Sequence, residues 1–318
     1  MINYIIQTNR QSLISSLKDY FDTFSKTKNV IINLSKSEDI LKFKNEILNN
    51  QVKYFVFSNG SDPIDVRIYH EILKINPDQK CLFSENAWLT WQDFLYLDDS
   101  GIGNNCSVYD YTDIDIPVVN IPNSLYSLVN SKVSEQLNKG IKCPLKDYVL
   151  VPLQVDGDSK IIIGSPHFKT VTEFIMYIID MVPSNVTILF KNHPLNKNAV
   201  PIPKRDNVID ITNSGYSKKS LILNSLFVAG INSTFLIESI YLRNKTVAYG
   251  LDIFSNKNIV IDGYNKDFDT IVNTDIEISN IDNFINLLIS KQIPKNHMTA
   301  SYKIITTNEE TFTPCCTS

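Results

Sequence analysis

A lysine and a histidine stand directly after an apolar run, in the segment Lys191-Asn-His-Pro194. The preceding residues 186–190 read Val-Thr-Ile-Leu-Phe, which is typical of a buried strand. Because proline restricts the residue before it to an extended conformation, His193 is expected to point outward from the strand end. A lysine cation and a histidine N–H can stabilise a departing phosphate. A surface turn is the alternative, but this is one of only four histidines, and its position favours phosphate binding.

A second group of small and polar residues follows the apolar run 226–229, in Gly230-Ile-Asn-Ser-Thr234. Ser233 and Thr234 are placed to open a helix, whose first free N–H groups attract phosphate. Either residue could also be an ordinary N-cap, and the two interpretations are compatible. Glu238 lies four residues after Thr234, on the same helix face, where it could accept from ribose hydroxyls or simply be solvated.

A pair of acids follows the apolar run 149–153, in Asp156-Gly-Asp158. Such an Asp-x-Asp pair can hold a divalent cation, because carboxylates are the oxygen ligands that these ions prefer. Asp-Gly is also a common turn pair. From these residues alone, a turn and a site both stay open.

The elements that must position these residues alternate between strand and helix along the chain. The strands expected are 4–6, 30–32, 54–57 and 81–83, then 149–153, 186–190, 208–209, 226–229 and 246–249. Between them lie helical patterns, one of which begins with a predicted capping box of Thr170 and Glu173. The alternation breaks between Glu85 and Ile121, which reads as an irregular and therefore functional stretch.

This rhythm predicts an α/β protein with two doubly wound, Rossmann-like halves. The expected domains are residues 1–140, on the acceptor side, and 141–300, on the nucleotide side, followed by a tail at 301–318. Ligands of such sheets bind beyond the carboxyl ends of the strands. All the polar groups above follow strands, as do Asn59-Gly60 and Glu85-Asn86, so all of them are expected at one edge, facing an interdomain cleft.

Composition narrows the class of partner. The chain has 318 residues, 43% of them hydrophobic, and a net charge of -4 without a basic block, which argues against nucleic-acid binding. Its five cysteines show no metal-type spacing, so reduced thiols and a cytoplasmic setting are expected. No apolar run approaches the ~20 residues that span a bilayer.

Four segments in order resemble one family. They read Cys-Leu-Phe-Ser-Glu-Asn-Ala-Trp at 81–88, Leu-Gln-Val-Asp-Gly-Asp-Ser at 153–159, Phe-Lys-Asn-His-Pro at 190–194, and Gly-Ile-Asn-Ser-Thr-Phe-Leu-Ile-Glu at 230–238. Together they resemble the bacterial capsule polysaccharide synthesis transferases that add Kdo, 3-deoxy-manno-octulosonic acid. The likeness is greatest to the retaining β-Kdo glycosyltransferases of capsule and O-antigen (lipopolysaccharide) assembly, and it spans about residues 81–250.

The resemblance implies a GT-B-like fold, CMP-Kdo as donor, and a glycan or lipid-linked oligosaccharide as acceptor, with no metal and no further cofactor. It also implies a place at the inner membrane as a peripheral protein, or membership of a larger polysaccharide synthesis protein. In the family the acid directly before the serine is functional, which assigns catalysis to Asp158, with Glu85, and leaves Asp156 to the turn. The donor-binding residues it implies are Gln154, Ser159, Lys191, His193, Ser233, Thr234 and Glu238.

Departures from the family pattern keep alternatives open. Residues 87–91 read Ala-Trp-Leu-Thr-Trp in place of the commoner Gly-Trp-Phe-Pro-Gln type, so the acceptor is not assigned. A CMP-sialic acid sialyltransferase is the first alternative, although its acidic-acidic-glycine order differs from the Asp-Gly-Asp found here. A teichoic-acid type glycerophosphotransferase and a catalytically inactive nucleotide-sugar binding module are the others.

Overall fold

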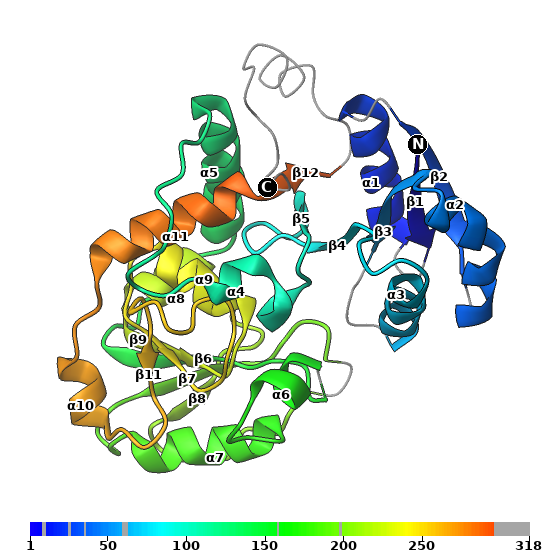
Figure 1. Cartoon of the computed structure of the whole chain (residues 1–318). Helices are drawn as coiled ribbons and strands as arrows, with labels where there is room; N and C mark the ends of the chain where they lie inside the picture. The colour runs from blue at the N-terminus through cyan, green and yellow to red at the C-terminus, as the bar shows by residue number, and fades with distance from the viewer. Residues whose placement is uncertain are drawn as a thin grey trace. The chain divides into compact units, whose positions relative to one another are not determined.

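The computed structural model describes residues 1–7, 11–24, 27–34, 36–58, 63–157, 159–196 and 199–295. The chain forms two compact units, each built on one six-stranded sheet (Figure 1). Unit 1 comprises Met1–Val108, Asn120–Leu128 and Leu288–Ser318, and unit 2 comprises Tyr109–Val119 and Val129–Leu287. These units are less contiguous than the domain ranges expected from the sequence, because short segments on either side of residue 120 and after residue 287 group with the other sheet.

Unit 1 has the strand order β12-β5-β4-β3-β1-β2. Its strands are β1 (Ile2–Gln7), β2 (Lys28–Asn33), β3 (Val52–Phe57), β4 (Cys81–Asn86), β5 (Phe94–Asp98) and β12 (Gln292–Pro294). The first four are parallel, whereas β5 runs antiparallel to both β4 and β12. Its helical segments are α1 (Gln11–Phe24), η1 (Ser37–Phe43), α2 (Lys44–Leu48), α3 (Pro63–Ile75) and η2 (Gly103–Asn105).

Both faces of the unit 1 sheet are buried, as alternation along β1 shows. Tyr4 and Ile6 pack in one core with residues of η1, α2 and α3, whereas Ile5 packs in a second core with residues of α1. Since successive strand residues point to opposite faces, a strand covered on both sides must be apolar throughout. The doubly wound arrangement expected for this half is confirmed.

The stretch expected to be irregular contains a strand. Strand β5 is buried along its whole length, and its Tyr96 ring stacks on Trp88 with ring centroids 3.9 Å apart. The connection between β4 and β5 is closed by β12, where the Gln292 side-chain oxygen accepts from the backbone N–H of Leu89 at 2.9 Å. The segment is thus a folded antiparallel extension of the sheet.

Unit 2 has the strand order β11-β10-β9-β6-β7-β8, and all its pairings are parallel. Its strands are β6 (Tyr148–Pro152), β7 (Ile188–Lys191), β8 (Val208–Asp210), β9 (Ser225–Gly230), β10 (Thr246–Ala248) and β11 (Ile261–Asp262). The chain runs outward from β6 to β8 and then from β9 to β11 in the opposite direction. The order therefore reverses between β6 and β9, which is the topological switch point of this sheet.

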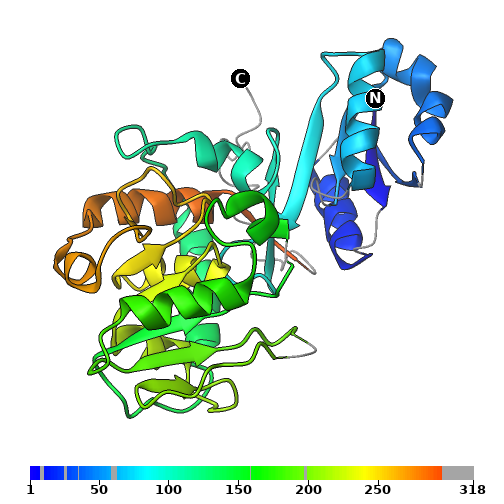
Figure 2. The same cartoon turned by 90° about the horizontal axis from the view of Figure 1, so that it is seen from below.

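Helices cover the two faces of this sheet. They are α6 (Ser159–Gly164), α7 (Val171–Met181), α8 (Lys218–Leu223), α9 (Thr234–Tyr241) and α10 (Phe268–Asn273). In Figure 1, α7 lies below the sheet and α8 and α9 lie above it, and Figure 2 shows α7 lying across one face. The capping box predicted at the start of α7 is confirmed, since the Thr170 side chain accepts from Glu173 N–H and the Glu173 carboxylate accepts from Thr170 N–H.

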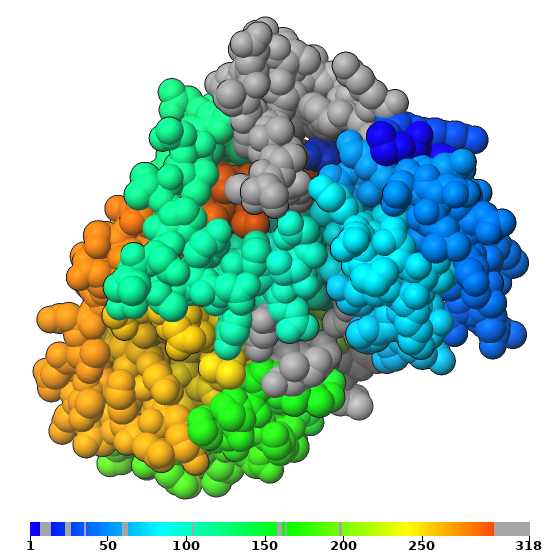
Figure 3. Space-filling view, in the orientation of Figure 1, coloured from blue at the N-terminus to red at the C-terminus, as the bar shows by residue number. Residues whose placement is uncertain are grey.

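Aromatic rings join the late part of unit 2 to α7. The rings of Tyr264 and His167 stack 3.4 Å apart, and Tyr264 also lies 6.1 Å from the ring of Tyr177. In Figure 3 the yellow and orange residues after about 250 accordingly lie against the green residues of α6 and α7. Tyr177 and Tyr264 also pack against the core that α7 forms with the sheet.

A buried lysine anchors the segment Tyr109–Val119 within unit 2. The side chain of Lys257 is fully buried, and its ammonium donates to the backbone carbonyls of Tyr109 and Ser255, both at 3.2 Å, and of Tyr111. Asp113 N–H also donates to the carbonyl of Asn256 at 3.0 Å. Helices α4 (Ser107–Asp110), α5 (Asn123–Asn138) and α11 (Ile278–Ser290) carry the chain across the boundary between the units.

Candidate functional site

The residues predicted for donor binding gather at the carboxyl edge of the unit 2 sheet. Strands β6, β7 and β9 are adjacent and parallel, so their carboxyl ends lie at the same edge. Gln154 follows β6, Lys191 ends β7, and Ser233 follows β9. The expectation of one shared edge is confirmed for these three residues. It is wrong for Glu85-Asn86, which belong to the other sheet, and Asn59-Gly60 lie outside the described residues.

Two amides hold the switch point together. The Gln154 side-chain N–H donates to Asn232 Oδ1 at 2.9 Å, and the Asn232 backbone N–H donates to Gln154 Oε1 at 3.1 Å. Asn232 also donates to the Leu251 carbonyl, after β10, at 3.2 Å. Both amides are buried. Gln154 therefore fixes the turn before α9, and Asn232, which the sequence analysis did not single out, is its partner.

Ser233 is the N-cap of α9. Its hydroxyl accepts from Phe235 N–H at 3.2 Å, and its backbone is extended, as an N-cap requires. Thr234 is the first residue of the helix and is exposed. The capping interpretation of Ser233 is confirmed, and the start of α9 presents the positive end of a helix at this edge.

Lys191 is a half-buried cation at the end of β7. Its ammonium donates to the Thr212 carbonyl at 3.4 Å. Burial, and next the charge of Lys218, lower the pKa of Lys191, while Asp210 opposes that shift. A hollow of about 370 Å³ lies at the end of β8, and none of the predicted site residues lines it; its lining residues are Leu145, Ile209, Asp210, Ile211, Asn213, Ser214 and Tyr216.

His193 lies in the loop after β7, and hydrogen bonds of His193 and Asn192 fix the conformation of this loop. Its Nδ1 accepts from Leu195 N–H at 3.2 Å. The proton of the neutral ring therefore resides on Nε2, which gives the ring a donor. The buried Asn192 side chain accepts from Val200 N–H at 2.9 Å and donates to Val200 O at 3.2 Å, which closes the loop on itself.

Glu238 is engaged with other protein groups. Its two carboxylate oxygens accept from the Lys218 ammonium at 2.6 and 2.8 Å, and one of them also accepts from the Gln136 amide at 2.9 Å. Burial raises the pKa of Glu238 overall, although Lys218 acts in the opposite direction. The solvated alternative for Glu238 is wrong, because the side chain is buried.

Lys218 was not among the residues predicted from the sequence. This residue opens α8, capped by Ser217, which follows the carboxyl end of β8. Ser-Lys-Lys after a short strand is a weak signal. Its pairing with Glu238 depends on the packing of α8 against α9, which the 20-residue spacing between them does not show.

Of the two acids in Asp156-Gly-Asp158, Asp156 is among the residues that the structure describes. Asp156 and Gly157 form a turn, with Gly157 at φ +77°, and Asp156 Oδ1 accepts from Val171 N–H at 3.1 Å at the start of α7. This agrees with the turn interpretation of Asp156. Asp158 lies outside the described residues, and Ser159 is the first residue of α6. The catalytic role of Asp158 stays a prediction.

Glu85 belongs to the other unit. It is half-buried on β4, opposite Tyr96 of β5, and its Oε1 accepts from Asn86 N–H at 2.7 Å. Its pairing with donor-side residues stays a prediction, as does the cleft between the two halves.

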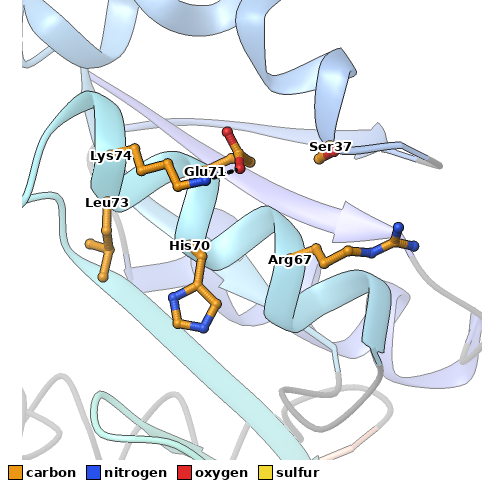
Figure 4. Close-up of a pocket in the computed structure, with 6 residues that line it drawn as sticks. All are labelled: Ser37, Arg67, His70, Glu71, Leu73 and Lys74. Atoms are coloured by element: carbon orange, nitrogen blue, oxygen red, sulfur yellow. Dashed lines mark hydrogen bonds and ion pairs between the residues drawn. The ribbon is translucent and has the colours of Figure 1, made fainter.

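A separate hollow of about 570 Å³ lies in unit 1 between η1 and α3. It is lined by Ser37, Arg67, His70, Glu71, Leu73 and Lys74 (Figure 4). Its polar groups are on the surface, and Lys74 and Glu71 form an ion pair at 2.6 Å. None of the predicted site residues lines it.

A metal-ligand cluster and a membrane-spanning helix are both absent from the described part of the chain. Within the described ranges, no group of three or more His, Cys, Asp or Glu side chains is arranged to hold a metal ion. Over the same part of the chain, no helix is both long and apolar enough to cross a bilayer. Independence from metal remains a prediction.

Comparison with known proteins identifies what the chain resembles. The family of capsule polysaccharide biosynthesis proteins matches residues 124–292, more than half of the chain. A search of curated protein sequences finds no match.

Two solved structures share the fold. They are from Thermosulfurimonas dismutans KpsC, described as the β Kdo 2,7 transferase and the β Kdo 2,4 transferase. The first has a TM-score of 0.60 at 18% identity, covering 97% of this chain and 100% of that one. The second has a TM-score of 0.60 at 13% identity, covering 89% of each chain. This likeness confirms the predicted GT-B-like fold.

Proposed function

Because this chain belongs to the family of capsule polysaccharide biosynthesis proteins, we propose that it is a glycosyltransferase that moves Kdo from CMP-Kdo to a glycan or lipid-linked oligosaccharide. The product would be a β-linked Kdo in capsule or O-antigen synthesis. The observation that carries the proposal is the carboxyl edge of unit 2, where Lys191 and His193 follow β7 and the start of α9 follows β9, on either side of β6. Related folds in KpsC are described as Kdo transferases, which supports this choice of sugar.

The carboxyl edge of unit 2 provides groups that can stabilise the negative charge of a departing CMP. The phosphate becomes more negative as its bond to the sugar breaks, and groups fixed beforehand stabilise that charge without having to reorganise. Lys191 supplies a positive charge, His193 Nε2 supplies an N–H, and the start of α9 supplies the positive end of a helix. This binding needs no metal in the proposal.

Two carboxylates would carry out the transfer with retention. In the first step the Asp158 carboxylate bonds to the anomeric carbon, and CMP leaves with the electron pair of the broken C–O bond. In the second step an acceptor hydroxyl gives its proton to Glu85 and attacks the same carbon, and Asp158 leaves with its electron pair. Two inversions at one carbon retain its configuration. The reaction belongs in the cytoplasm in this proposal, with a membrane-held acceptor bringing the protein to the inner membrane.

The choice of nucleotide can be tested by thermal unfolding. We expect CMP to stabilise the protein, since a ligand at 100 times its Kd adds about 2.7 kcal/mol of stability. His193→Ala should remove most of the shift in Tm, because it deletes the donor nearest the phosphate in this proposal. His70→Ala, an exposed histidine of unit 1, is the control and should keep the shift. A larger shift with UDP than with CMP would exclude both the Kdo and the sialic acid functions.

Metal independence can be tested on the transfer itself. With CMP-Kdo and an oligosaccharide acceptor, the rate should stay within about twofold of its untreated value after EDTA, because protein cations neutralise the leaving phosphate. A rate that collapses and returns with Mg²⁺ or Mn²⁺ would make the acids at 156–158 a metal clamp, contrary to the proposal.

A further inference from the structure

An ion pair joins the first residue of α8 to the fifth residue of α9. The Lys218 ammonium donates to both oxygens of Glu238, at 2.6 and 2.8 Å. The same ammonium lies 5.3 Å from the centre of the Phe235 ring, one residue into α9. The positive charge of Lys218 therefore stands beside a side chain of α9, the helix whose start the proposed function assigns to the donor phosphate.

The side chain of Lys218 is partly exposed, and its ammonium has one N–H donor that the ion pair does not use. The lysine side chain is 30% exposed, whereas that of its partner is 9% exposed. An ammonium has three N–H donors, of which the carboxylate takes two. No third hydrogen bond of this group is found within the described parts of the chain, so a ligand at the edge can reach it.

Lys218 and Lys191 share this edge. Lys191 ends β7, and Lys218 opens α8 after the adjacent parallel strand β8, where its charge is the second cause, after burial, of the lowered pKa of Lys191. The oxygens of the buried Glu238 carboxylate are already taken up by Lys218 and Gln136, and Asp210 is a second carboxylate, close enough to Lys191 to oppose the lowering of its pKa. The two cations and the two carboxylates balance in charge, so what the site offers an anion is the remaining N–H donor of Lys218 beside the Lys191 ammonium.

We propose that Lys218 binds the phosphate of the donor nucleotide together with Lys191, and that Glu238 is a positioning residue that aims Lys218 instead of holding ribose. The inference rests on the proposed function, because it takes the nucleotide to be CMP. Lys218, which would bind the phosphate, lies outside the four sequence segments that resemble the family.

Comparing CMP with cytidine isolates the phosphate. Binding is measured by calorimetry for the wild type, Lys218→Met and Lys219→Met, the last being an exposed neighbour of equal charge. A charge-assisted hydrogen bond contributes enough for Lys218→Met to weaken CMP binding roughly 10- to 100-fold. Cytidine binding should be unchanged, and Lys219→Met should bind both ligands as the wild type does.

Variants of Glu238 test whether this residue orients the Lys218 ammonium toward the phosphate. Glu238→Gln should lower the preference for CMP over cytidine when Lys218 is present and should have no further effect in the Lys218→Met background. The double variant Lys218→Met/Glu238→Gln removes the buried unpaired charge, so it keeps the measurement valid if the single variant unfolds. Lys218→Arg should recover part of the CMP affinity, because it restores the cation.

The outcomes separate the inference from the proposed function. If the wild type binds CMP and the double variant binds it within twofold of the wild type, Lys218 does not contact phosphate and the inference is wrong, while the function stands. If the wild type does not bind CMP, both are wrong.

Discussion

Asp158→Asn should lower the rate of Kdo transfer by roughly 10³- to 10⁴-fold, as loss of a reacting group does in other enzymes. The amide keeps the size of the side chain but cannot bond to the anomeric carbon as a carboxylate does. CMP binding should be preserved, because the groups proposed to bind phosphate are untouched. The effect therefore falls on the rate of the chemical step and not on donor affinity.

The covalent step has a direct readout. Wild-type protein mixed with CMP-Kdo in the absence of acceptor should gain the mass of one Kdo group, on a peptide that contains Asp158, and Asp158→Asn should gain none. Asp156→Asn is the matched control two residues away. It weakens a hydrogen bond to the start of α7, at a stability cost of about 1 kcal/mol, and should still form the adduct. Full activity in Asp158→Ala would remove this residue from the mechanism.

Lys257→Met should lower the free energy of unfolding by about 3 kcal/mol, because methionine fills the buried space but leaves the carbonyls bound by this ammonium without that donor. The amides of Tyr109–Val119 should also exchange hydrogen faster, since this lysine holds their segment to the rest of unit 2.

Urea unfolding and hydrogen exchange measure the two effects. Lys204→Met changes an exposed lysine of the same unit and should alter stability by less than about 0.5 kcal/mol. If Lys257→Met were as mild as this control, the lysine would not be the anchor of the segment.

The parallel strands could be predicted because their signal is local. Short apolar runs bounded by turns mark β3, β6, β7 and β9 without knowledge of what covers them, and the residues that follow them locate the edge. Strand β5 escaped prediction because it lies among aspartates and tryptophans. Its burial also depends on β12, nearly 200 residues later in the chain.

The candidate site was predictable to the extent that its residues follow strands. Lys191 and His193 stand where their strand ends, as expected. Ser233 also proved to be a cap, which pattern alone already allowed. The role of Lys218 and the burial of Glu238 could not be predicted, because both depend on how α8 packs against α9. Neither produces a periodic pattern in the sequence.

The switch point is held by two amides, Gln154 and Asn232, and this has a consequence for the pH dependence of the protein. Amide side chains do not titrate, so the link that sets the spacing of the β6 and β9 loops is the same in acid and in base. A change of CMP affinity with pH would then report the ionisation of the nucleotide and of the cations beside it, within an unaltered frame. Measuring the affinity for CMP at several pH values would therefore report the charges of CMP and of the nearby lysines, while the spacing of the two loops stays constant.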